Sequence, residues 1–130
     1  MGARQIARPC SVWAAVRAAD WEKLERLLDA DPQAVKSRGA VGETLLHMCY
    51  LLHSPERTEI AHRLLARAPA LVRTVYEGAV YRGENALHMA IANSDLPEAR
   101  FLFRRCRRLL YGLAGALLRG LVLYCQSNAR

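Results

Sequence analysis

The chain has 130 residues, enough for one domain, and its 52% hydrophobic and 24% charged residues are ordinary for a folded globular protein and exclude wholesale disorder. The net charge of +7 is unevenly distributed: residues 1–99 contain ten Arg and two Lys against twelve acidic residues, whereas residues 100–130 contain seven Arg and no acid. The excess charge therefore belongs to the C-terminal segment, and we expect no nucleic-acid binding by the rest of the chain.

Residues 1–10 form an N-terminal extension that lacks the apolar core of a secretory signal, and we recognise no targeting signal in it. The four cysteines, at positions 10, 49, 106 and 125, have neither the close pairing of a zinc site nor a histidine pair at finger spacing. We therefore expect free thiols in a reducing compartment, and neither a metal site nor a cofactor.

Three helical units are predicted in chain order. Residues 11–41 form the first unit, because positions 12–28 show the apolar rhythm of two short helices. The second unit, residues 42–82, begins with the sequence GETLLHM, and the third unit, residues 83–103, begins with the closely similar GENALHM. The return of such a motif is typical of a solenoid whose units bury their apolar faces against one another.

The repeated motif predicts where the inner helices begin. Its structural residues are Gly42, Thr44 and His47 in one copy and Gly83, Asn85 and His88 in the other. Thr44 and Asn85 occupy the position at which a short polar side chain accepts hydrogen bonds from the first turn of a helix. Glu43 and Glu84 precede these helices, where the helix dipole stabilises a negative charge.

The second helix of each unit is predicted over residues 56–68 and 97–103. Leu65 lies further along the chain from the first motif histidine, His47, than Leu102 lies from the second, His88. If the two leucines are equivalent, this difference predicts an insertion at positions 53–56 of the middle unit.

The connections between units, residues 31–41 and 69–82, are unequal. The second contains aromatic and apolar residues at Val72, Val75, Tyr76, Val80 and Tyr81. Loops longer than about 12 residues are usually functional or disordered, and we expect this loop to be an ordered, projecting finger.

The tail, residues 104–130, is basic and apolar. Four arginines recur at helical spacing, with apolar residues on another face: Arg100, Arg104, Arg107 and Arg108, against Leu102, Cys106, Leu109 and Leu113. This pattern predicts an amphipathic C-terminal helix that lies on anionic lipid or an acidic partner, or else closes the stack.

The apolar run at 109–125 is too short, and too interrupted by Arg119 and three glycines, to cross a bilayer. Any membrane contact would come through this tail.

The sequences TLLH at residues 44–47 and NALH at 85–88 resemble the Thr-Pro-Leu-His signature of ankyrin repeats, with the proline replaced in both copies. Residues 38–47 and 76–91 further resemble the N-terminal ankyrin domain of vanilloid-type transient receptor potential (TRPV) channels, above all invertebrate sensory members. The discriminating feature is the long finger that ends in the aromatic-basic-glycine step at residues 81–83. The resemblance covers residues 11–103 and is lost in the tail, as expected of a truncated gene model, a read-through or a short isoform.

The resemblance implies an all-α ankyrin solenoid of about three units with long finger loops, in the cytosolic arm of a calcium-permeable cation channel subunit of the plasma membrane. Its partners would be the other subunits of a homo- or hetero-tetramer. Some members of the family bind ATP or calmodulin on this domain through basic and aromatic residues around the fingers, so Arg38, Tyr76, Tyr81 and Arg82 are the candidate binding residues. The alternative is that Tyr76 and Tyr81 pack the finger against its neighbour.

The histidines are interpreted as structural. In the resembled fold, His47 and His88 bridge the capping position and the neighbouring loop, while His53 and His62 are expected to face solvent. No catalytic dyad, nucleophile elbow or phosphate-cradling loop is present, so an enzyme is not expected.

A free-standing cytoplasmic ankyrin scaffold that binds a protein partner is the alternative to the channel subunit. The absence of any pore sequence in these 130 residues favours the scaffold. The composition of the long finger favours the channel.

Overall fold

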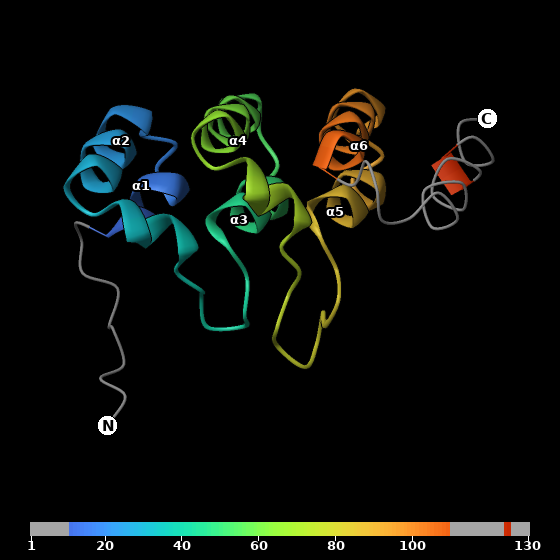
Figure 1. The fold of residues 1–130 in the computed structure, drawn as a ribbon, viewed down its shortest axis with the longest axis horizontal. Coiled ribbons are helices and arrows are strands. Elements are labelled where there is room, and N and C mark those ends of the chain that lie inside the picture. Colours follow the sequence, from blue (N-terminus) through green and yellow to red (C-terminus); the bar gives the residue numbers. More distant parts are fainter. Residues whose placement is uncertain (1–10, 110–123, 126–130) are drawn as a thin grey trace.

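The computed structural model describes residues 11–109 and 124–125. Its fold consists of three helical hairpins placed side by side (Figure 1). The elements are α1 (Val12–Arg17), α2 (Trp21–Ala30), the 3-10 helix η1 (Pro32–Lys36), α3 (Leu45–Leu51), α4 (Pro55–Arg67), the 3-10 helix η2 (Pro69–Arg73), α5 (Ala86–Ala92) and α6 (Leu96–Leu109). Within this part of the chain there is no strand, which confirms the all-α prediction.

The helices lie in two layers (Figure 1). The first helices of the hairpins, α1, α3 and α5, pack on one another in sequence, and each also packs on the second helix of its own hairpin. The loops after η1 and η2 project from the same side of the stack, beyond the α1, α3, α5 layer. Each hairpin therefore contacts mainly its neighbours, as in a linear array.

Each of the helices α1 to α6 begins after a polar side chain that accepts a hydrogen bond from the backbone N–H three residues on. These capping residues are Ser11, Asp20, Thr44, Ser54, Asn85 and Asp95. Such caps satisfy donors that a helix leaves open at its start, and each contributes about 1 kcal/mol. The predicted starts after Thr44 and Asn85 are confirmed.

The hydrophobic core runs through all three hairpins without interruption. Its largest fully buried aliphatic side chains are Leu24, Leu28, Leu45, Leu46, Ile60, Leu64, Leu65, Leu87 and Leu102. Leu51, the last residue of α3, and Leu52, which follows it, are exposed, so the end of this apolar run lies outside the core.

The predicted insertion in the middle hairpin is wrong. Residues 52–54 join α3 to α4 and residues 93–95 join α5 to α6, so the two turns have equal lengths. Ala61 is fully buried and follows His47 at the same sequence separation as Leu102 follows His88. Matching leucine to leucine selected Leu65 instead, because a small residue that fills a buried position carries no strong hydrophobic signal.

The turns inside the hairpins share a strained backbone. Ala19, His53 and Ser94 have φ values of 54°, 27° and 57°, in the left-handed region that residues with a Cβ rarely adopt. Each lies one residue before the cap of the hairpin's second helix. The same local bend therefore reverses the chain in all three units.

The C-terminal helix α6 runs through the predicted boundary at residue 103 without a break. Leu102 and Cys106 are buried, whereas Arg100, Arg104, Arg107 and Arg108 are exposed, so the helix is amphipathic over its described length. Residues 1–10, Leu113 and most of the apolar run at 109–125 lie outside the described residues. In the described part of the chain, no helix has the length and apolar character needed to cross a membrane.

Candidate binding surface

The base of the long finger is fixed to the stack through His47. Its Nδ1 accepts a hydrogen bond from the backbone N–H of Thr44 at 2.9 Å, and its Nε2 lies 3.1 Å from the carbonyl oxygen of Thr74, at the start of the finger. Because a carbonyl can only accept, Nε2 carries the proton and the ring is neutral. Burial lowers the pKa of His47 to about 4, which matches this assignment. The predicted bridging role of His47 is therefore present in the fold.

His88, the second copy of the motif histidine, makes only half of this arrangement among the described residues. Its Nδ1 accepts from the backbone N–H of Asn85 at 3.0 Å, as in the first copy. The imidazole is exposed, and no bond from its Nε2 to a carbonyl occurs within residues 11–109. The motif histidine is therefore buried beneath a finger in the first copy and exposed in the second.

Arg38 joins the loop after η1, residues 37–44, to the loop after η2, residues 74–85; we call these loops the first and second fingers. Its guanidinium donates to the carbonyl oxygen of Gly42 at 2.9 Å and to that of Val75, and it forms an ion pair with Glu77 at 3.3 Å. The first contact is within its own loop, and the other two reach the next finger. Most of the donor capacity of Arg38 is thus used inside the protein, although it was predicted as a ligand-binding residue.

The fingers also touch through their backbones, at two glycines. The Glu77 N–H donates to the carbonyl oxygen of Gly42 at 3.3 Å. A Cβ added to Gly78 would lie 1.9 Å from the Val41 carbonyl oxygen, and one added to Gly42 would lie 2.3 Å from the Gly78 nitrogen. Gly42 also has a φ of 84°, which favours glycine. Only residues without side chains allow the loops to approach this closely.

Tyr76 is a packing residue of the finger. Its side chain is buried and its ring stacks on His47 with a centroid distance of 4.4 Å. Burial, together with the nearby Glu43 carboxylate, raises the pKa of Tyr76 to about 12, so its hydroxyl stays protonated at physiological pH. Glu43 itself is buried and accepts from the backbone N–H of Val41 at 2.9 Å, so it acts within the first loop.

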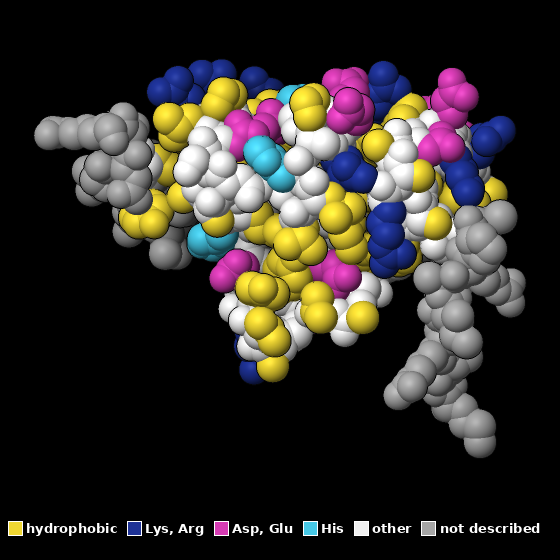
Figure 2. Space-filling model, turned by 180° about the vertical axis from the view of Figure 1, so that it is seen from behind, with side chains coloured by type: hydrophobic (Ala, Val, Ile, Leu, Met, Phe, Trp, Pro, Cys, Tyr) yellow, Lys and Arg dark blue, Asp and Glu magenta, His cyan; other side chains and the backbone are white. Residues whose placement is uncertain are grey.

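Tyr81 and Arg82 lie on the outer part of the finger. Tyr81 packs against Tyr76 with a centroid distance of 5.4 Å, yet 45% of it remains exposed. Arg82 is exposed, and Val80 is 75% exposed. Figure 2 shows hydrophobic side chains gathered on the projecting fingers. Of the four predicted binding residues, Tyr76 is buried, Arg38 is half-buried and bonded to both fingers, and Tyr81 and Arg82 are accessible.

The second finger has a closed base. The Tyr76 N–H donates to the Glu84 carbonyl oxygen at 2.7 Å, and the Gly83 N–H donates to the Tyr76 carbonyl oxygen at 3.0 Å. These bonds tie residues 76–84 into a hairpin-like loop. The prediction of an ordered finger is confirmed.

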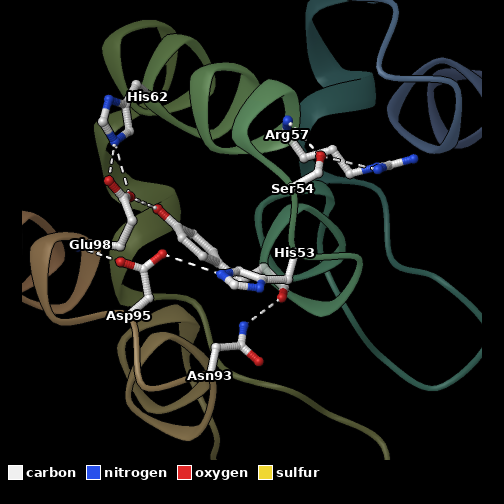
Figure 3. Close-up of polar contacts among 8 residues, drawn as sticks. His53, Ser54, Arg57, His62, Asn93, Asp95 and Glu98 are labelled. Carbon is white, nitrogen blue, oxygen red and sulfur yellow. Dashed lines mark hydrogen bonds and ion pairs between the residues drawn. The ribbon is translucent and has the colours of Figure 1, made fainter.

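A polar cluster that the sequence did not predict joins the second and third hairpins (Figure 3). Glu98, which is buried, accepts from the Tyr50 hydroxyl at 2.8 Å and lies 2.8 Å from His62 Nε2. His53 Nε2 lies 3.3 Å from an Asp95 carboxylate oxygen. The expectation that His53 and His62 face solvent is wrong for His62, which is half-buried and stacks on Phe101 at 3.9 Å.

Two further bonds secure the joints between hairpins. Asn93 donates to the Tyr50 carbonyl oxygen at 2.8 Å, and Arg57 donates to the Val16 carbonyl oxygen at 3.2 Å. The partners in all of these bonds are far apart in the chain. No local pattern signals such pairs.

Neither a candidate metal cluster nor an activated buried thiol occurs in residues 11–109 and 124–125. In this part of the chain no group of three or more His, Cys, Asp or Glu side chains is arranged to hold a metal ion. Burial raises the pKa of Cys49 to about 12 and also raises that of Cys106, so neither thiol is activated.

No protein-family profile matches the chain, and a comparison with curated proteins finds no match.

Proposed function

We propose that this chain is an ankyrin-type recognition module that binds partners through its projecting fingers. Support comes from the His47 bridge, in which the histidine of a Thr-Leu-Leu-His motif caps its own helix and binds the carbonyl of the following loop. Together with Arg38, this bridge fixes the fingers to one another and to the stack. A prearranged surface loses little entropy on binding.

We further propose that the module is the cytosolic portion of a TRPV-like, calcium-permeable channel subunit at the plasma membrane, where it contacts other subunits and regulates the channel. This rests on the sequence resemblance. The accessible residues Tyr81 and Arg82 support it, because an exposed aromatic ring and an exposed guanidinium on adjacent residues suit a nucleotide or a calmodulin surface.

Calorimetric titration of the full chain with ATP and with calcium-loaded calmodulin tests the binding role. We expect the double substitution Tyr81→Ala and Arg82→Ala to weaken whichever interaction occurs by about tenfold or more, because a stacked ring and a charge-assisted contact are both lost. Arg26→Ala, an exposed arginine of the first hairpin, is the matched control and should leave affinity unchanged. Equal losses in both variants would contradict a finger site.

Sequencing the full-length transcript separates the channel from the free-standing scaffold. Six apolar segments and a pore loop downstream of this region would support the channel subunit. A transcript that encodes only more short helical repeats would support a cytoplasmic scaffold.

A further inference from the structure

The exposed face of α6 carries a row of arginines that the finger site does not use. Arg100, Arg104, Arg107 and Arg108 are exposed and recur at helical spacing, which places them on one side of the helix. Figure 2 shows Lys and Arg side chains along the top left edge of the molecule, at the end where α6 lies. We call these four residues the arginine face.

The arginine face has no acidic partner among the described residues, unlike three other arginines of the fold. Arg38, Arg63 and Arg67 form ion pairs with Glu77, Glu59 and Asp29. Within the described residues, by contrast, no ion pair involves a member of the arginine face. Even Arg105, between two of its members, lies over the Phe101 ring at 5.1 Å. The sequence from residue 100 onward has no acid that could neutralise this charge.

We propose that the arginine face is a docking surface for an anionic lipid membrane. The apolar side of α6, with Leu102 and Cys106, is buried against the stack, so α6 meets its partner through charge and not by inserting its own apolar face. Anionic headgroups attract a cationic surface, and each basic residue close to the membrane adds to the attraction. Four arginines on one side of a rigid helix therefore give a substantial attraction.

The sequence next to the arginine face favours lipid over an acidic protein as the partner. Residues 109–125 follow directly, are almost entirely apolar and contain two tyrosines. A basic segment beside an apolar one supplies the two signals that stable membrane-surface binding requires. An acidic protein would need only the charges. This inference is independent of the finger site.

Co-sedimentation of the full chain with lipid vesicles tests the proposal. The probes are vesicles of phosphatidylcholine alone and vesicles of phosphatidylcholine mixed with phosphatidylserine. The test variant carries Arg104→Gln, Arg107→Gln and Arg108→Gln. The matched control carries Arg17→Gln, Arg26→Gln and Lys36→Gln, which removes the same charge from exposed positions of the first hairpin and its 3-10 helix.

We expect binding to the phosphatidylserine vesicles that weakens with added salt, and a loss of at least about tenfold in the test variant. The control should lose less than about twofold, and circular dichroism should show that both variants fold. Equal losses in the two variants would overturn the proposal, because net charge alone would explain binding. Equal wild-type binding to neutral vesicles would overturn it in favour of apolar partitioning. Tighter binding to polyglutamate than to phosphatidylserine vesicles would assign the surface to an acidic protein.

Discussion

His47 and His88 are the same residue of the same motif in two different environments. Both accept a hydrogen bond from the N–H of their capping residue, yet only His47 is buried and bonded to a second loop among the residues that the structure describes. The pair therefore separates the contribution of the cap from that of the inter-loop bridge.

Replacing each histidine by alanine measures this difference. His47→Ala leaves the Thr44 N–H and the Thr74 carbonyl without their partner and opens a void beneath Tyr76, so we expect a loss of about 2–4 kcal/mol in the free energy of unfolding. His88→Ala should cost under about 1 kcal/mol, because water replaces the exposed bond. Urea denaturation provides both values, and equal losses would show that the bridge contributes nothing.

The same buried imidazole predicts a dependence of stability on pH. The pKa of His47 is about 4 in the folded protein against 6.5 for the ordinary group. As pH falls from 6.5 to 4 the unfolded chain therefore takes up a proton that the folded chain does not, and stability decreases. We expect His47 to account for a loss of about 3 kcal/mol in the free energy of unfolding over that pH range, and for little further loss at lower pH.

The measurement is the difference in unfolding free energy between wild type and His47→Gln as a function of pH. Subtracting the variant removes the contributions of the other titrating groups. A difference that stays constant between pH 6.5 and 4 would contradict a neutral, buried His47.

At the scale of elements, the fingers are held together by backbone contact, and Gly78 and Gly83 test it within one loop. Gly78→Ala would drive a Cβ into the Val41 carbonyl, so we expect it to cost about 2–3 kcal/mol. Gly83→Ala meets no atom within 4 Å and costs only the strain of its φ of 85°, about 1 kcal/mol.

Hydrogen exchange at the Glu77 amide, which donates to the Gly42 carbonyl, locates the effect. Exchange should accelerate in Gly78→Ala and remain slow in Gly83→Ala. If both variants behave alike, the two fingers are not in contact in solution.

The helices and their caps were predictable from sequence because their signals are local. Thr44 and Asn85 lie within one helical turn of the N–H groups that they cap, and this spacing is visible in the chain. The bonds of Glu98 to Tyr50 and His62 join different hairpins, so nothing in the sequence pairs them. The exposure of Tyr81 beside the burial of Tyr76 was equally hidden, since the two residues have similar neighbours in the sequence.

At the scale of the whole molecule, the linear arrangement makes cooperativity depend on the joints between hairpins. The buried carboxylate of Glu98 connects the second and third hairpins through Tyr50 and His62. Because neighbours supply most of the stability of a repeat unit, weakening one joint should uncouple the unit beyond it.

An isolated stack of three units should also be marginally stable, and a sharp melt at high temperature would contradict this.

Glu98→Ala tests the joint, and the two tryptophans make the readout selective. Trp13 and Trp21 both lie in the first hairpin, so their fluorescence follows that end of the stack, whereas far-ultraviolet circular dichroism follows every helix. We expect coincident transitions in the wild type and, in the variant, a circular dichroism transition that precedes the fluorescence transition. Coincident transitions in the variant would mean that the three hairpins unfold as one unit regardless of this joint.

The closed base of the second finger allows the sequence of its tip to change with little effect on the helices. Hydrogen bonds between Tyr76 and residues 83 and 84 separate the tip from the helices, and lengthening a flexible loop costs only about 0.6 kcal/mol per doubling. A foreign peptide grafted between Ala79 and Val80 should therefore lower the melting temperature only slightly. Lineages could diversify this tip rapidly while the scaffold beneath it stays constant, much as antibody loops vary on an unchanging framework.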